Sequence, residues 1–144
     1  MNSLDTNILI YAINPTCSEH LKAKAIYEEL LDNPSSWILS DQVIFEFYRA
    51  LRNSKVVTNP LNHKNALEQI IFLREESGAL CCSYEISLWP DLIKHQKKYE
   101  SNSVQIFDSI LATTLLNNGV KNFYTRNTKD FKKFEFANLI NPID

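Results

Sequence analysis

The sequence predicts an α/β fold, a three-layer α/β/α sandwich in which helices cover both faces of a central, mainly parallel sheet. Short apolar segments typical of buried strands alternate along the chain with longer segments of helical periodicity. Such alternation requires crossover connections, which place helices over the faces of a parallel sheet. The chain has 144 residues, the size of one ordinary domain, and no repeat or linker divides it. Residues 1–144 are therefore expected to form a single domain.

Five short segments have the composition of strands. The first ends at Asp5, and the second begins at Trp37, directly after the turn sequence Asn33-Pro34-Ser35-Ser36. Strands are expected ahead of Asp5 and at residues 37–39, 80–83, 122–125 and 138–140.

Six longer segments have helical character. Ser40 is a typical N-cap for the third, and Pro90 is tolerated only in the first turn of the fifth. Gly119 is a natural residue just beyond the end of the sixth. The expected helices cover residues 8–13, 19–31, 41–52, 62–77, 87–99 and 104–118.

Composition excludes several classes of protein. Only two glycines occur, Gly78 and Gly119, so neither a G-x-G-x-x-G fingerprint nor a Walker motif can be written. The three cysteines, Cys17, Cys81 and Cys82, form no C-x-x-C pair and fit a reducing compartment. No signal-peptide pattern or membrane-length apolar run is found. We therefore expect a soluble, cytoplasmic protein with no membrane partner.

The net charge of −2 does not indicate a nucleic-acid binder, but the basic residues are clustered. Residues 121–133 hold five lysines and arginines against one acid, and residues 94–98 hold three more lysines. Such segments can follow a phosphate backbone even in a slightly acidic protein. The alternative is that these are solvated surface lysines.

Four acids stand where a metal site would need them: Asp5, Glu46, Asp108 and Asp130. Asp5 ends the first strand, and ligands collect at the carboxyl ends of parallel strands. Asp130 lies in a loop just past the strand at 122–125. Clustered carboxylates are the oxygen ligands that Mg²⁺ or Mn²⁺ requires. The acids therefore suggest a metal-dependent phosphodiesterase.

Each acid also has a structural interpretation. Asp5 can be an ordinary N-cap. Glu46 lies on the apolar stripe of its helix, so it needs a cation, a basic partner or a cleft, unless the helix is turned to expose it. Asp108 is a first-turn acid, and the helix macrodipole would stabilise its ionised form. For Asp130, the alternative is an ordinary loop aspartate.

Other catalytic arrangements have no support. His20, His63 and His95 share no metal-ligand spacing, which argues against a zinc site. The chain has no G-x-S-x-G elbow and no cysteine with an evident histidine partner, so nucleophilic hydrolysis is not indicated.

Four segments in register resemble the PIN-domain family over essentially the whole chain, and most closely its VapC-type toxins. They are D-T-N at residues 5–7, S-D-Q-V-I-F-E-F at 40–47, F-D-S-I-L-A-T at 107–113 and Y-T-R-N-T-K-D-F at 124–131. The resemblance implies a compact, single-domain endoribonuclease.

The resemblance also implies roles for particular residues. A metal site would be formed by Asp5, Glu46, Asp108 and one acid of the last motif. Many relatives carry an aspartate where this chain has Asn127, which leaves the fourth acidic position open between Asn127 and Asp130. The supporting residues would be Thr6, which orients Asp5, together with Thr125 and Asn127, while Arg126 and Lys129 would hold the flanking phosphates of RNA.

The function implied is a Mg²⁺- or Mn²⁺-dependent endoribonuclease that cleaves single-stranded or looped RNA as the toxin of a type II toxin–antitoxin pair. A homodimer and a cognate antitoxin protein are the expected partners. Because four packed carboxylates repel one another, raised pKa values or a looser pocket are expected without metal. One alternative is a non-catalytic RNA- or protein-binding module with a degraded metal site. A phosphotransferase of the haloacid-dehalogenase kind fits poorly, since its second aspartate would fall at Asn7.

Overall fold

The computed structural model describes residues 1–144 and has five short strands, all of which pair in parallel. One sheet has the order β1-β4-β5, and β2 pairs with β3 beside it. A single bridge between Asn2 and Trp37 joins the two groups of strands. The predicted mainly parallel sheet is therefore confirmed. The strands are β1 (Asn2–Leu4), β2 (Ile38–Ser40), β3 (Leu80–Cys82), β4 (Asn122–Tyr124) and β5 (Asn138–Ile140).

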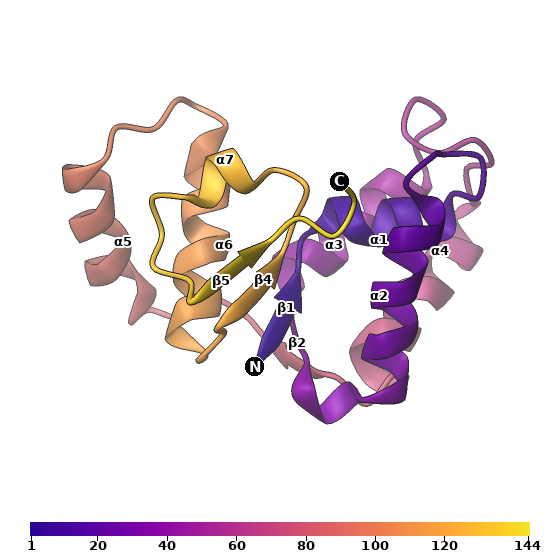
Figure 1. Cartoon of the computed structure of the whole chain (residues 1–144), viewed down its shortest axis with the longest axis horizontal. Helices are drawn as coiled ribbons and strands as arrows, with labels where there is room; N and C mark the ends of the chain where they lie inside the picture. The colour runs from indigo at the N-terminus through magenta and orange to yellow at the C-terminus, as the bar shows by residue number, and fades with distance from the viewer.

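Helices lie on both sides of the sheet. Figure 1 shows the strands between α5 and α6 on one side and α1 and α2 on the other. This arrangement confirms the three-layer α/β/α prediction. The helices are α1 (Thr6–Ile13), α2 (His20–Asp32), α3 (Asp41–Leu51), α4 (His63–Ile71), α5 (Leu88–Lys98), α6 (Gln105–Asn117) and α7 (Thr128–Phe131).

The helix boundaries follow from local chemistry. The Ser40 hydroxyl accepts a hydrogen bond from the main-chain N–H of Gln42 at 3.2 Å, so the predicted cap of α3 is confirmed. Gly119 follows the end of α6 with φ +77°, a conformation that favours glycine. The expected helix at 62–77 is divided, because α4 ends at Ile71 and a π-helical turn continues through Phe72–Glu76.

The core joins the sheet to its helices through large apolar side chains. Trp37 and Phe123 are buried, and the Phe123 ring packs against Phe131 with centroids 4.9 Å apart. Burying a side chain of this size contributes about 1.5–3 kcal/mol relative to leaving it exposed. Because Phe131 belongs to α7, this contact fixes that helix, and its acid Asp130, against the end of β4.

The sheet positions two site residues side by side. The main-chain N–H of Asp5 donates to the Tyr124 carbonyl at 2.9 Å, and that of Thr125 donates to the Ile140 carbonyl at 2.9 Å. The ladder thus continues one residue past β1 and β4. Asp5 and Thr125 are placed together at the carboxyl edge of the sheet.

A second element differs from the sequence prediction. Asp130 was expected in a loop but lies in the first turn of α7. A four-residue helix is too short to show a hydrophobic period, so its sequence looks like a loop.

Among all the helices, none combines the length and the apolar character that crossing a membrane would require.

Candidate active site

Asp5 is the most buried acid of the site and the best fixed. Its Oδ1 accepts from the main-chain N–H of Thr6 at 2.8 Å, so the N-cap interpretation is correct. Its Oδ2 accepts from the hydroxyl of Thr125 at 2.7 Å and from the side-chain amide of Asn7 at 3.0 Å. The cap therefore uses one oxygen, while a separate network orients the other.

Burial has a clear electrostatic effect on Asp5. Its pKa is raised to about 6, mainly by loss of solvent and to a smaller extent by the charges of Glu46 and Asp108, while the hydrogen bonds from Thr125 and Thr6 oppose the rise. The raised pKa expected from packed acids is confirmed. Desolvation is nevertheless a larger cause than the repulsion that the sequence suggested.

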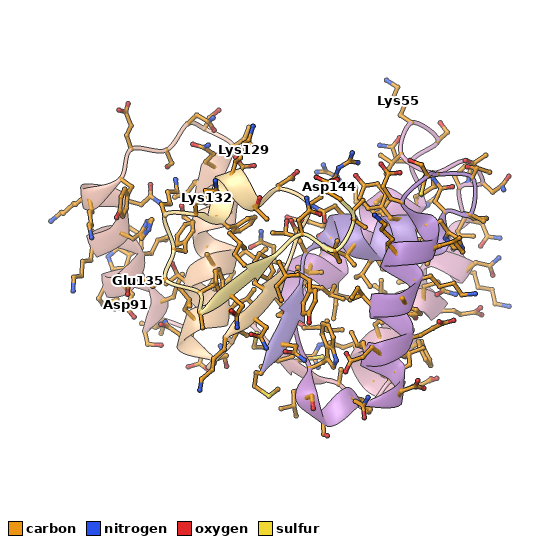
Figure 2. All side chains as sticks on the ribbon, in the orientation of Figure 1. Lys55, Asp91, Lys129, Lys132, Glu135 and Asp144 are labelled. Atoms are coloured by element: carbon orange, nitrogen blue, oxygen red, sulfur yellow. The ribbon has the colours of Figure 1, made fainter.

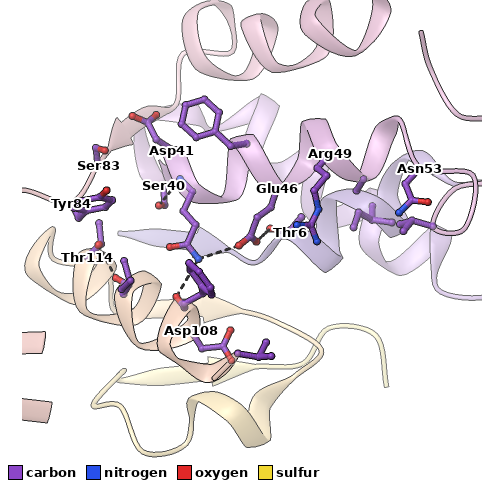
Figure 3. Close-up of a pocket in the computed structure, with 18 residues that line it drawn as sticks. Thr6, Ser40, Asp41, Glu46, Arg49, Asn53, Ser83, Tyr84, Asp108 and Thr114 are labelled. Atoms are coloured by element: carbon purple, nitrogen blue, oxygen red, sulfur yellow. Dashed lines mark hydrogen bonds between the residues drawn. The ribbon is translucent and has the colours of Figure 1, made fainter. Parts of the chain in front are cut away.

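Glu46 points into a groove rather than into the core. Of the explanations offered for an acid on the apolar stripe of its helix, the structure therefore supports the cleft. One carboxylate oxygen accepts from the hydroxyl of Thr6 at 2.7 Å. The other accepts from the side-chain amide of Gln42 at 3.1 Å, and Figure 3 shows both bonds as dashed lines. These two donors hold the carboxylate in one orientation.

Asp108 faces the same groove from the first turn of α6. Its pKa is raised to about 6, mainly by burial and then by the charges of Asp130 and Glu46, while Lys133 opposes the rise. Asp108 is thus a first-turn acid, as the sequence indicated, but its net pKa shift is upward. Loss of solvent and the neighbouring carboxylates are the causes that raise it.

The groove has a volume of about 1040 Å³ and runs between α3 and α6. Thr6, Glu46 and Asp108 lie on its wall, together with the guanidinium-bearing Arg49 (Figure 3). Its rim is apolar and exposed. Asp5 and Asp130 are not among the residues that line it, so the structure brings two of the four acids directly into the groove. The exposed rim side chains are Phe45, Tyr84, Val104 and Phe107.

The four acids suit a hard divalent cation by their chemistry. None forms a salt bridge with lysine or arginine within 4.0 Å, and Asp5 is buried without a compensating cation. Oxygen ligands of this kind are those Mg²⁺ and Mn²⁺ prefer. No three acids, histidines or cysteines lie close enough to share one ion in this structure. The chemistry of these oxygens fits the metal but their spacing in this structure does not, so the assignment of ligands stays a prediction.

The supporting residues are placed at the site, but with altered roles. Thr6 orients Asp5 through its main-chain N–H, whereas its hydroxyl holds Glu46. Thr125 binds Asp5 through its hydroxyl, as the resemblance implies. Asn127 supports Thr125 indirectly, because its main-chain N–H donates to the Thr125 hydroxyl oxygen at 3.0 Å, while its side chain is exposed.

The two basic residues expected to hold RNA differ in their surroundings. The Arg126 guanidinium forms an ion pair with Glu19 at 2.7 Å, donates to the Tyr11 hydroxyl at 2.8 Å and lies over the Tyr11 ring. It is therefore already engaged with the α1–α2 region. Lys129 is exposed on α7 and has no ion-pair partner (Figure 2).

Three site residues were missed by sequence reasoning. Asn7 donates to Asp5 and accepts from the main-chain N–H of Arg126 at 3.3 Å. Gln42 binds Glu46, and Arg49 lines the groove. Their spacings were available signals, since Gln42 and Arg49 lie four residues before and three residues after Glu46 on one helix face.

Comparison with known families and proteins agrees with this geometry. The family model described as PIN domain matches residues 3–137. Ribonuclease VapC24 of Mycobacterium tuberculosis is 34% identical over 151 residues, covering 99% of this chain and 97% of the relative. Ribonuclease VapC43 of the same organism is 24% identical over 144 residues, covering 100% of this chain and 97% of the relative.

Solved structures show the same fold. Mycobacterium tuberculosis VapC20, described as a sarcin–ricin loop cleaving toxin, has a TM-score of 0.72 at 14% identity, covering 98% of this chain and 100% of that one. FitAcB from Neisseria gonorrhoeae has a TM-score of 0.62 at 19% identity, covering 99% and 98%. The family match and the 34% identical relative show the family, and these structures agree with it in fold. The chain belongs to the PIN-domain family, among its VapC-type members.

Proposed function

We propose that this protein is a divalent-metal-dependent endoribonuclease that cleaves single-stranded or looped RNA, and that it is the toxin of a type II toxin–antitoxin pair. The observation that carries the proposal is a set of three carboxylates, Asp5, Glu46 and Asp108, that form no ion pair with lysine or arginine. Asp5 lies at the end of β1, and Glu46 and Asp108 lie on the groove wall. Hydroxyl and amide donors orient Asp5 and Glu46. The relatives named ribonucleases support the same chemistry.

Asp5, Glu46 and Asp108 would hold Mg²⁺ or Mn²⁺, with Asp130 as a fourth acid near Asp108. When bound, such an ion polarises a phosphoryl oxygen and lowers the pKa of a water molecule. The protein contributes orientation: the Thr125 hydroxyl fixes Asp5, and the Thr6 hydroxyl and Gln42 amide fix Glu46. With pKa values of about 6, Asp5 and Asp108 are ionised near neutral pH and available as ligands.

The groove offers places for the RNA strand. Arg49 lies on its wall beside Glu46, and Lys129 is exposed on α7 near Asp130. Both can bind phosphates on either side of the scissile bond. Arg126 would serve this purpose only by exchanging Glu19 for a phosphate, since the two side chains are now paired.

The proposed protein partners are a cognate antitoxin and a second copy of this chain. Support comes from the exposed apolar side chains around the groove, which include Phe45, Val104 and Phe107 at 65%, 71% and 57% exposure. Exposed apolar patches of this kind commonly mark protein interfaces. An antitoxin segment covering this rim could also place an arginine or lysine near the unpaired acids. The proposed place of action is the cytoplasm, where RNA is found.

The test is cleavage of a panel of structured and unstructured RNAs by the purified protein with Mn²⁺, Mg²⁺ or EDTA. Asp5→Asn and Asp108→Asn should lose cleavage, while Asp32→Asn, an exposed acid at the end of α2, should retain it. Circular dichroism checks that the variants fold. Equal cutting by all variants would contradict the proposed site.

Absence of cutting by the wild type would contradict the enzymatic proposal for that panel. A calorimetric titration with Mn²⁺ then separates the remaining alternatives. Binding that is lost in Asp108→Asn would indicate a functional metal site and a narrower RNA target. No metal binding would favour the non-catalytic module.

A further inference from the structure

A second cavity lies away from the acidic groove, between α5, α6 and the segment that follows α7. Its volume is about 260 Å³. Three lysines line it, Lys94, Lys98 and Lys133, and none has a carboxylate within 4.0 Å. Asp91 and Glu135 also belong to the lining and are labelled together in Figure 2, but they form no ion pair with these lysines. The ammonium groups are therefore available to an external anion.

Aromatic packing holds the floor of this cavity. The His95 ring stacks on Phe134, with centroids 4.2 Å apart and planes within 12°, and its centroid lies 4.9 Å from that of Tyr99. The Lys98 ammonium lies 5.2 Å from the Tyr99 ring, and that of Lys133 lies 5.7 Å from the Phe134 ring. Cation–π contacts of this kind favour these positions of the charges. The cations are thus arranged around a rigid surface.

The cavity also contains unused hydrogen-bonding capacity. Both ring nitrogens of His95 are shielded from solvent without a well-formed hydrogen bond, although the Lys133 carbonyl lies within electrostatic reach. A buried donor without a partner costs about 1–3 kcal/mol. Asn117 contributes a side-chain amide to the wall, whereas the Thr113 hydroxyl already donates to the Ser109 carbonyl at 2.7 Å. An oxyanion would supply an acceptor to the exposed Asn117 amide and a countercharge to the lysines.

The cavity and the acidic site share α6, whose first turn carries Asp108 and whose later residues Thr113 and Asn117 line the cavity. Lys133, which lines the cavity, stands three residues after Asp130. Lys129 lies on α7 and Lys132 directly follows it, and Figure 2 labels both side chains there. A chain of phosphates leaving the acids in this direction would meet cations at each step. Because Phe134 is buried, its ring offers no exposed face for base stacking, which favours contact with the phosphate backbone.

We propose that this cavity, which we name the α5–α7 pocket, binds a backbone phosphate of the RNA strand outside the cleaved bond. The lining of the α5–α7 pocket is Asp91, Lys94, His95, Lys98, Tyr99, Thr113, Leu116, Asn117, Lys133, Phe134 and Glu135. The proposal rests on the proposed ribonuclease function and adds a substrate-binding site to it. The pocket would determine affinity and the length of RNA that binds well.

The experiment measures binding of a fluorescent single-stranded RNA in EDTA, which prevents metal-dependent cleavage, over a range of salt concentrations. The pocket variant is Lys94→Ala/Lys98→Ala/Lys133→Ala. The matched control is Lys24→Ala/Lys55→Ala/Lys64→Ala, which removes the same charge from exposed positions elsewhere. For the pocket variant, the slope of log affinity against log salt should fall by about 2, at roughly 0.7 for each lost contact on single strands.

The control should keep the wild-type salt slope. A short RNA that reaches only the acidic groove should bind the pocket variant and the control with equal affinity. An NMR titration with inorganic diphosphate gives a local readout, since the His95 ring signals should shift in the control and not in the pocket variant. Equal slopes for the two variants, with wild-type cleavage intact, would overturn the pocket alone. A third outcome is that diphosphate shifts the His95 signals while the pocket variant and the control bind long RNA with the same salt slope. The pocket would then bind free anions, and its assignment to RNA would be wrong. Failure of the wild type to bind or cleave any RNA would overturn the ribonuclease function and this proposal together.

Discussion

Gln42 and Glu46 form a bridge between the two helices that carry groove acids. The side-chain amide of Gln42 donates to Glu46 Oε1 at 3.1 Å and to the main-chain carbonyl of Phe107 at 3.1 Å. Phe107 immediately precedes Asp108. A single amide therefore sets both the orientation of one acid and its separation from the helix that bears the other.

The first prediction concerns this bridge. Gln42→Ala should lower kcat for RNA cleavage about 10-fold, the equivalent of one hydrogen bond to a charged group, with little change in KM. Glu46 would lose one of its two donors, and α3 would be less firmly tied to α6. Gln69→Ala, at an exposed position on α4, is the control. An unchanged kcat in Gln42→Ala would show that the bridge has no role in cleavage.

The second prediction concerns the buried hydroxyl of Thr125. Thr125→Val keeps the shape of the side chain but removes the hydrogen bond that lowers the pKa of Asp5. Loss of such a supporting interaction typically weakens metal binding about 10–100-fold. Thr125→Ser restores the hydroxyl and should recover most of the affinity for Mn²⁺, measured by calorimetry. Similar affinities for the valine and serine variants would contradict this role.

The third prediction concerns stability without metal. Asp108 has a pKa of about 6 in the folded protein, against 3.8 ordinarily, so the folded state holds its proton longer than the unfolded state. The stability from this group is present below about pH 4 and is lost as pH rises through about 6. Asp108→Asn removes the charge. It should therefore raise the free energy of unfolding near pH 7 by about 1 kcal/mol, discounted for partial exposure.

Urea unfolding in EDTA at several pH values measures this effect. The gain in Asp108→Asn should disappear near pH 4, because wild-type Asp108 is then protonated as well. Asp32→Asn, at an exposed position, controls for general charge effects. A gain that is the same at all pH values would show that ionisation of Asp108 is not its cause. The same variant loses cleavage in the proposed function, so activity and metal-free stability should change in opposite directions.

Much of the fold was available from local sequence patterns. All five strands were expected, because each is a short apolar run between turn signals, and Ser40 and Gly119 mark helix ends by their chemistry. The four-residue helix α7 was missed because it is too short for a period. The π-helical turn after Ile71 was missed because its sequence still looks helical.

The site was predicted in part. The acids could be found because carboxylates at a strand end or on an apolar stripe need an explanation. The role of Gln42 could not, since it depends on the distance between α3 and α6, which no local pattern records. Nor could sequence show that Arg126 pairs with Glu19, a contact between residues 107 positions apart.

The last prediction concerns the fourth acidic position. Asn127 has an exposed side chain and contributes through its main chain, whereas the charge of Asp130 raises the pKa of Asp108 and so acts on the groove. Asp130→Asn should therefore reduce cleavage and lower the pKa of Asp108, while Asn127→Ala should leave both nearly unchanged. NMR titration of the Asp108 carboxyl, without metal, measures the pKa independently of activity. If Asn127→Ala abolishes cleavage and Asp130→Asn does not, the fourth position belongs to Asn127, and this chain uses an amide where a carboxylate was expected.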